Sequence, residues 1–119
     1  MRARKMQELE QVIEHAFDNR KQGFDNRPQV EAAVEEAITL LDSGKVRVAE
    51  KEDGDWHVNQ WLKKAVLLSF GLAENRVIES GHSRFYDKVP MKYADYSEEQ
   101  FKADGVRVVP DAIVRRGAY

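Results

Sequence analysis

The sequence predicts an α+β protein: an antiparallel helix pair, a β-hairpin and a central apolar helix, ending in the first strands of a parallel β-helix. Three observations predict this class. Apolar residues recur at spacings of three and four in residues 6–17 and 30–41, as on one face of a helix. Asp53-Gly54 separates two short segments that alternate in polarity, as in a hairpin turn. Residues 108–119 repeat an aliphatic and a small residue every six positions, which is the spacing of a parallel β-helix.

Length and composition limit the classes that are open to the chain. Its 119 residues are 42% hydrophobic with only 7 Gly and 3 Pro, which suits one buried core and excludes disorder. The 19 basic and 21 acidic residues leave a net charge of −2, so no global field favours nucleic acid or an anionic membrane. Cysteine is absent and His15, His57 and His82 lie far apart, so we expect no metal site and no bound cofactor. Without an export signal or an apolar run that could span a membrane, we expect a cytoplasmic protein.

Two helices are predicted first. One begins near Met6 and ends before Gly23. The next starts at Pro28, whose missing N–H costs nothing in a first turn, and ends before Gly44, which can adopt the left-handed conformation of a C-cap. The short connection between them predicts an antiparallel helix hairpin. The apolar stripe of the second helix consists of Val30, Ala33, Val34, Ala37, Ile38 and Leu41.

The segments 45–51 and 56–58 are predicted to pair as the β-hairpin. A two-residue turn at Asp53-Gly54 sets Trp56 opposite Lys51 and Val58 opposite Ala49. Pairing Val48 with Val58 instead would need an odd loop or a bulge. The sequence leaves the register open between these two.

A third helix follows Asn59, which can cap it, and runs to Leu72. After Lys63-Lys64 it is apolar nearly all round, and such a helix is normally buried on several sides. Either the chain buries it centrally, or one face of residues 65–72 meets something outside these residues.

The remaining elements before residue 106 are short. Val77-Ile78 predicts a strand, and residues 83–96 show no clean period, so we expect a loop packed on the domain. Ser97 caps a short helix with Gln100 at the capping-box position, and Asp104-Gly105 ends it.

The last twelve residues change character. Val108 and Val114 are six positions apart, and so are Ala112 and Ala118. In a parallel β-helix the aliphatic residue fills the interior of a coil and the small residue lets the chain turn the corner. Stacked repeats bury their core only between neighbours, so two copies could not stand alone. An ordinary strand that ends in a polar tail is the alternative.

Four stretches resemble the N-terminal region of the tetrahydrodipicolinate N-succinyltransferases. They are LLDSGKVRVAEK (40–51), NQWLKKAVLLSF (59–70), SRFYDKVPMKYADY (83–96) and VRVVPDAIVRRGAY (106–119). The likeness runs in order from about Met6 to the last residue. It departs from the family at Val106, where a phenylalanine is usual, and at Asp111, where a second proline is usual. The first helix and the loop around Phe24 are also more divergent.

The resemblance implies that residues 1–105 form the N-terminal α+β domain and residues 106–119 the stub of a left-handed hexapeptide-repeat β-helix. It implies a homotrimeric, cytoplasmic enzyme of diaminopimelate and lysine biosynthesis that transfers succinyl from succinyl-CoA to tetrahydrodipicolinate. The acidic catalytic residues and most of the coenzyme site would lie in the β-helix, so we expect these 119 residues alone to be inactive. The alternative is a free-standing oligomerisation or protein-interaction module without catalysis.

Arg107 is the one substrate-binding position that the resemblance implies in this chain. It corresponds to the arginine of the family's Arg-Val-Val-Pro motif. A guanidinium can hold a carboxylate through two parallel charge-assisted hydrogen bonds, which suits a dicarboxylate acceptor. Without the resemblance, Arg107 would be interpreted as a surface arginine beside a strand.

Two other patterns have simpler interpretations than a functional site. Ser80-Gly81-His82 with Asp87 lacks the strand–turn–helix context of a nucleophile elbow and is better explained as a turn. Residues 84–93 interleave basic and aromatic side chains, as single-strand nucleic-acid binders do. However, residues 84–119 contain 7 basic and 6 acidic residues, so we expect no electropositive track and no nucleic-acid partner.

Overall fold

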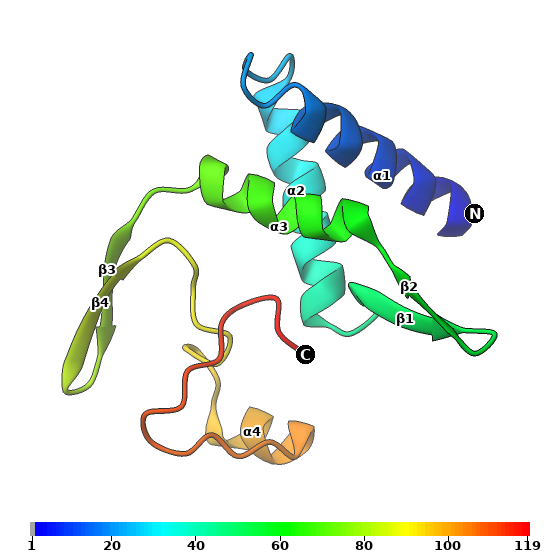
Figure 1. The fold of residues 1–119 in the computed structure, drawn as a ribbon. Coiled ribbons are helices and arrows are strands. Elements are labelled where there is room, and N and C mark those ends of the chain that lie inside the picture. The colour runs from blue at the N-terminus through cyan, green and yellow to red at the C-terminus, as the bar shows by residue number, and fades with distance from the viewer. Residues whose placement is uncertain (1) are drawn as a thin grey trace.

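A computed structural model of the chain describes residues 2–119 and the side chains of residues 4–119 (Figure 1). Within this range the fold is α+β, with four helices and two separate two-stranded antiparallel sheets. In chain order the elements are α1 (Arg2–Asp18), α2 (Arg27–Asp42), β1 (Ala49–Glu52), β2 (Asp55–Val58), α3 (Gln60–Leu72), β3 (Arg76–Ser80), β4 (Ser83–Asp87) and α4 (Glu98–Asp104). None of the helices in the described residues is long and apolar enough to cross a membrane.

Helix α2 forms as the sequence predicted. Pro28 lies in its first turn, and the side chain of Asn26 caps it by accepting a hydrogen bond from the Gln29 N–H at 3.2 Å. Gly44 follows the helix with a φ of +75°, the left-handed conformation expected of it. The buried residues of α2 are the six of the predicted apolar stripe: Val30, Ala33, Val34, Ala37, Ile38 and Leu41.

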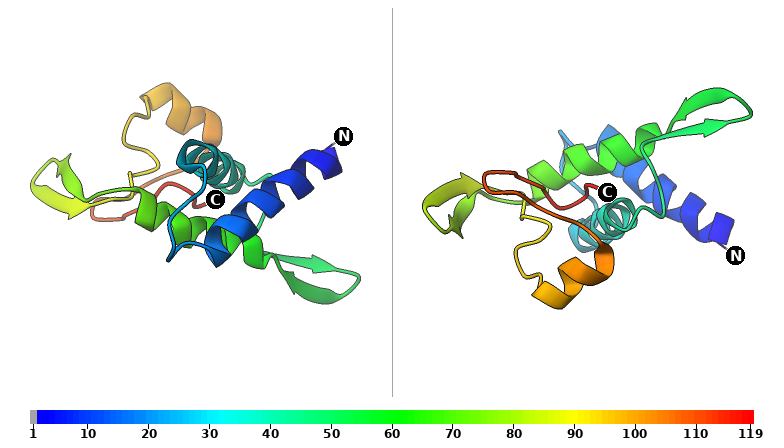
Figure 2. Two further views of the ribbon diagram at one scale, coloured as in Figure 1. Left: turned by 90° about the horizontal axis from the view of Figure 1, so that it is seen from above. Right: turned by 90° about the horizontal axis from the view of Figure 1, so that it is seen from below.

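Helix α1 begins at Arg2, earlier than the predicted start near Met6, and its packing also differs from the prediction. The two helices run in roughly opposite directions, as predicted, but α1 diverges from α2 as the second arm of a V instead of lying alongside it (Figure 1). In Figure 2, α2 is seen nearly end-on while α1 runs across the view. The reason is α3, which packs against both helices, so the pair opens to let all three apolar stripes meet.

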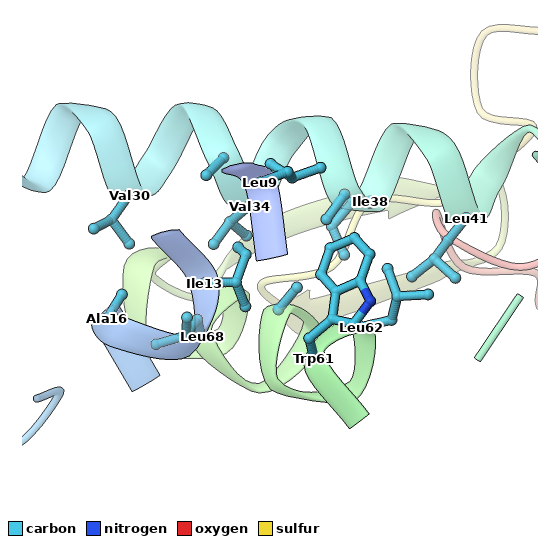
Figure 3. Close-up of a cluster of buried hydrophobic side chains, with 13 residues drawn as sticks. Leu9, Ile13, Ala16, Val30, Val34, Ile38, Leu41, Trp61, Leu62 and Leu68 are labelled. Atoms are coloured by element: carbon cyan, nitrogen blue, oxygen red, sulfur yellow. The ribbon is translucent and has the colours of Figure 1, made fainter. Parts of the chain in front are cut away.

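The core lies where α1, α2 and α3 meet (Figure 3). Ile13 of α1 and Leu62 of α3 are its largest fully buried side chains. The complete set of buried residues is Leu9, Ile13, Ala16, Val30, Ala33, Val34, Ala37, Ile38, Leu41, Trp61, Leu62, Ala65 and Leu68. The two hairpins and α4 contribute none of these residues.

Helix α3 is central, but it is buried on one face only. Leu62 is 0% exposed, whereas the side chain of Leu67 on the opposite face is 53% exposed. Asn59 occupies the N-cap position as predicted, but its side chain makes no capping hydrogen bond. Instead, its Nδ2 donates to the Arg47 carbonyl at 2.7 Å, and its N–H donates to the Val48 carbonyl at 2.7 Å. Asn59 therefore ties the start of α3 to the residues that precede β1.

The β1–β2 hairpin has the register that a two-residue turn requires. Ala49 pairs with Val58 and Lys51 with Trp56, so no bulge is needed. Asp53 and Gly54 both have positive φ, 51° and 87°, as the type I′ hairpin turn demands. Within the described residues this hairpin packs against no other helix or strand.

The β3–β4 hairpin confirms the strand at Val77-Ile78 and shows that the loop predicted for residues 83–96 is wrong in its first five residues. Strand β4 pairs with β3 across a two-residue turn at Gly81-His82, where Gly81 has a φ of +55°. Ile78 and Phe85 lie opposite each other on one face, and Val77 and Tyr86 on the other. Residues 83–87 are ordered by their pairing with β3. This pairing leaves no clear helical or strand periodicity in the sequence of residues 83–96.

Helix α4 is capped at both ends as predicted. The side chain of Ser97 accepts from the Gln100 N–H at 3.2 Å, and Gln100 Oε1 accepts from the Ser97 N–H at 2.8 Å. Gly105 ends the helix in the left-handed conformation, with a φ of +66°. This seven-residue helix therefore depends on its caps, because it buries no side chain of its own.

We expect Ser97→Ala to lower the local stability of α4 by about 1 kcal/mol, because the Gln100 N–H loses its partner. Amide hydrogen exchange of residues 101–105 measures this opening free energy directly. The control Ser97→Asp keeps an acceptor at the cap and should exchange as the parent does. Equal protection in the alanine variant and the parent would contradict the role of the cap.

Residues 106–119 do not form the strands of a β-helix coil. In the described residues their only ladder contact is an isolated antiparallel bridge between Met91 and Arg115. The chain turns at Asp111, which has a φ of +70°, and Ile113 remains 58% exposed. The expected β-helix strands are therefore absent here, since two hexapeptides lack the neighbouring coils against which such strands pack.

Candidate functional site

Arg107 lies three residues beyond the end of α4, in the extended segment that leads to Val108–Pro110. The Val106 N–H donates to the Phe101 carbonyl, which fixes the direction in which the chain leaves the helix. The Arg107 side chain is exposed and makes no hydrogen bond or ion pair within the described residues. Its five donors are therefore available to a ligand.

An apolar hollow of about 830 Å³ lies beside this segment. One wall is the Ile78–Phe85 face of the β3–β4 hairpin, and Phe101 of α4 lies on another side. The segment after Arg107 contributes Val108, Ile113 and Val114. The side chain of Arg107 lies outside this lining.

Three aromatic rings link α4 to residues 93–96, which precede it in the chain. The ring centroids of Tyr93 and Tyr96 are 4.8 Å apart, and that of Phe101 lies 5.2 Å from that of Tyr96, both pairs in edge-on geometry. The Tyr96 hydroxyl donates to Asp104 Oδ2 at 2.6 Å, which links residue 96 to the last residue of α4. These contacts hold α4 and residues 93–96 together as one unit.

The hydrogen bond to Asp104 raises the pKa of Tyr96 to about 12 from 10.0. Because the folded value lies above the unfolded one, the stabilisation is fully present below pH 10 and is lost as the pH rises from 10 to about 12. We expect Asp104→Ala to return the pKa of Tyr96 toward 10, as measured by an NMR pH titration of its ring. The control Asp95→Ala should leave that titration unchanged, and an unchanged titration in Asp104→Ala would contradict the assignment.

The residues of the Ser80-Gly81-His82 pattern do not converge on one point. They form the β3–β4 turn, and the His82 Nε2 lies 3.4 Å from Asp111 Oδ1. Asp87 instead pairs with Arg115 at 3.0 Å. Hydrogen bonds from the backbone N–H groups of Lys88 and Val89, and from the Arg115 guanidinium, lower the pKa of Asp87. The structure therefore shows a turn and a separate ion pair here, and no nucleophile–base pair.

The basic residues of 84–93 each have a partner within the chain. Arg84 pairs with Glu79 at 3.1 Å, and the Lys88 Nζ donates to the Phe70 carbonyl at 2.8 Å. Lys92 reaches Asp42 and Ala118. Across residues 4–119, no three His, Asp or Glu side chains are grouped so that they could hold a metal ion.

The structure also brings together residues that no motif in the sequence connects. The Arg116 guanidinium donates to both carboxylate oxygens of Glu35, at 3.0 and 2.5 Å, and to Thr39 Oγ1 at 3.0 Å. Glu35 and Arg116 border a second hollow of about 530 Å³ between α2, α3 and residues 88–90 and 115–117. The partners are separated by 77 or more residues, and no local spacing pattern signals contacts of that range.

The comparison with protein families identifies the class of this domain. Residues 8–72, which contain most of α1 together with α2, the β1–β2 hairpin and α3, match the family described as the tetrahydrodipicolinate N-succinyltransferase N-terminal region. The chain belongs to this family.

Curated relatives extend the match over nearly the whole chain. The chain is 57% identical over 116 residues to 2,3,4,5-tetrahydropyridine-2,6-dicarboxylate N-succinyltransferase of Alkalilimnicola ehrlichii, covering 96% of the chain and 43% of that relative. The proteins of the same name from Acinetobacter baylyi and Shewanella sediminis are 57% and 55% identical over 116 residues, each covering 96% of the chain and 42% of the relative. The chain thus spans about two fifths of the length of these relatives.

Proposed function

We propose that this chain is the N-terminal domain of an enzyme that transfers succinyl from succinyl-CoA to tetrahydrodipicolinate, in diaminopimelate and lysine biosynthesis. The observation that carries the proposal is the 57% identity to relatives that bear this name, which extends over 96% of the chain. The match to the family model ends at residue 72, whereas the match to these relatives extends over 116 residues and so into the tail that contains Arg107.

Within that enzyme we propose that Arg107 binds a carboxylate of tetrahydrodipicolinate. Its exposed side chain, which has no partner in the described residues, supports this assignment. Two charge-assisted hydrogen bonds to a planar carboxylate would use the donors that the fold leaves open.

We also propose that residues 106–119 begin a left-handed β-helix, and that the complete enzyme is a cytoplasmic homotrimer. Val108 and Val114, the aliphatic residues of the six-residue repeat, are only half-buried, which supports the first part, because an aliphatic residue of a hexapeptide needs a coil above or below it. The trimer and the compartment rest on the resemblance alone.

A chimera tests the proposed function. In it, these 119 residues replace the matching N-terminal part of the Acinetobacter baylyi relative, and release of CoA from succinyl-CoA is measured with tetrahydrodipicolinate present. We expect turnover within about tenfold of the parent enzyme, which corresponds to a barrier change of about 1.4 kcal/mol or less. A folded chimera with the parent's oligomeric state and no turnover would overturn the proposal.

The 119 residues assayed alone should show no turnover, because the acidic catalytic residues would lie in the part that they lack. Turnover by the purified chain would show that this assignment of the catalytic residues is wrong. Sedimentation of the same sample tests one form of the interaction-module alternative, in which the chain self-associates through α3.

A further inference from the structure

Residues 93–113 form a closed loop that carries the aromatic cluster, α4 and Arg107. Its two ends meet in a short stem, in which the Lys92 N–H donates to the Val114 carbonyl and the Arg116 N–H donates to the Pro90 carbonyl, both at 2.9 Å. The bridge between Met91 and Arg115 lies between these two hydrogen bonds. In the described residues, no hydrogen bond or ion pair joins residues 93–113 to residues 2–72. The polar contacts that place Arg107 relative to the helical core therefore all pass through the stem or the β3–β4 hairpin.

Lys92 joins the stem to the C-terminal end of α2. Its Nζ donates to the Asp42 carbonyl at 2.6 Å, to Asp42 Oδ1 at 3.1 Å and to the Ala118 carbonyl. These three acceptors use all three donors of the ammonium group, whose side chain is only 10% exposed. A cation at this position is also favoured by the helix dipole, because Asp42 is the last residue of α2.

The residues that follow the stem close around this contact. The Gly117 N–H donates to the same Asp42 Oδ1 at 2.8 Å, so Asp42 is bound by both strands of the stem region. The Tyr119 ring then lies against Gly44, where a Cβ would come within 2.6 Å of the ring. Lys92 Nζ and the Arg47 guanidinium lie 5.7 and 5.4 Å from the centre of that ring. In Figure 1 the C-terminus accordingly lies beside the lower end of α2.

We propose that Lys92 is a positioning residue for Arg107: by holding both strands of the stem on the end of α2, it sets where the 93–113 loop presents the guanidinium to the acceptor substrate. A surface lysine would not serve this purpose, because its flexible ammonium group would exchange partners with water. Lys92 instead has a nearly buried ammonium group with a full set of fixed acceptors. The effect on substrate rests on the proposed function, whereas the anchoring of the loop does not.

The anchoring is tested on the 119-residue chain with Lys92→Met. This substitution keeps most of the apolar part of the side chain and removes the ammonium group. We expect amide hydrogen exchange in residues 93–116 to accelerate about tenfold or more, since hydrogen bonds to a charged group are lost. The matched control is Lys64→Met. Lys64 is also a partly buried lysine, paired with Glu14 at 2.5 Å, but it joins α3 to α1 and does not touch the stem. Equal exchange of residues 93–116 in the two variants would overturn the anchoring.

The positioning is tested in the chimera with the same two variants, at a temperature at which both are folded. Lys92→Met should raise the KM for tetrahydrodipicolinate about tenfold, as displacement of a binding group does, and leave the KM for succinyl-CoA unchanged. Lys64→Met should change neither value, although it also removes a partly buried ion pair. Unchanged KM values in a folded Lys92→Met chimera would overturn the positioning role.

The same assays separate this inference from the proposed function. If Arg107→Ala leaves the chimera unaffected, the substrate contact of Arg107 is wrong, while the exchange experiment still decides whether Lys92 anchors the loop. If Arg107→Ala raises the acceptor KM and Lys92→Met does not, Arg107 binds substrate without help from Lys92. Lys92→Arg adds a further readout, since a guanidinium in place of the ammonium group cannot direct three donors to the same three oxygens and should restore exchange protection only in part.

Discussion

Leu62→Ala is expected to lower the free energy of unfolding by about 3 to 4 kcal/mol, the range typical of a leucine removed from a tightly packed core. Leu62 is fully buried, at the point where α3 meets α1 and α2 (Figure 3). Truncation removes apolar contacts and leaves a cavity that three crossing helices cannot easily close. Denaturant unfolding followed by circular dichroism measures the change from the shift of the midpoint at constant slope.

Leu67→Ala is the matched control for this prediction. It makes the same chemical change five residues along the same helix, where the side chain is 53% exposed. We expect a loss below about 1 kcal/mol there, because little buried contact is removed. Equal losses at the two positions would show that the inner and outer faces of α3 have been assigned wrongly.

Arg107→Ala in the chimera should lower kcat/KM for tetrahydrodipicolinate by about 30-fold to 100-fold, or about 2 to 3 kcal/mol. This is the range expected when charge-assisted hydrogen bonds to a carboxylate are lost. The change should appear mainly in KM if the contact is equally strong in the ground state and the transition state. Steady-state kinetics with each substrate varied in turn measures it.

Two further variants make the test of Arg107 specific. Arg107→Lys keeps the charge but cannot form the planar two-point contact, so its kcat/KM should lie between those of the parent chimera and Arg107→Ala. Arg76→Ala removes another exposed arginine, on β3, and should have no effect on either substrate. A normal kcat/KM in Arg107→Ala would exclude the substrate contact.

The helical part of the fold was predictable because its signals are local. The stripe of α2, its N-terminal Pro28 and the Ser97 capping box each specify structure within a few residues, and the structure confirms all three. The β1–β2 register was also recoverable, since Asp53-Gly54 can adopt the two positive φ angles of a tight turn. For these elements the local preference and the final packing agree.

The incorrect or incomplete predictions concern contacts between distant residues. The V of α1 and α2 follows from the insertion of α3, which the two helices alone could not reveal. Strand β4 was missed because Gly81-His82 was interpreted as a turn without the second strand that such a turn joins. The outward-facing Tyr86 and the half-buried Phe85 do alternate in β4, but over too few residues to stand out from the aromatic-rich segment.

The candidate site was predictable only in part. The position of Arg107 came from a family resemblance, because an exposed arginine after a short helix has no chemical signature of its own. Lys92 carried even less information, since its partners Asp42 and Ala118 are 50 and 26 residues away. Only the folded chain brings these groups together at the end of α2.

The free edges of the β1–β2 hairpin bear on how the protein behaves at high concentration. A two-stranded sheet that packs against no other element offers unpaired backbone groups along both sides, which can template pairing between molecules. Glu50, Glu52 and Asp55 place negative charge along these strands, and two such edges that approach each other repel. The repulsion between these carboxylates opposes the growth of intermolecular sheets, even though Trp56 is exposed beside an open edge.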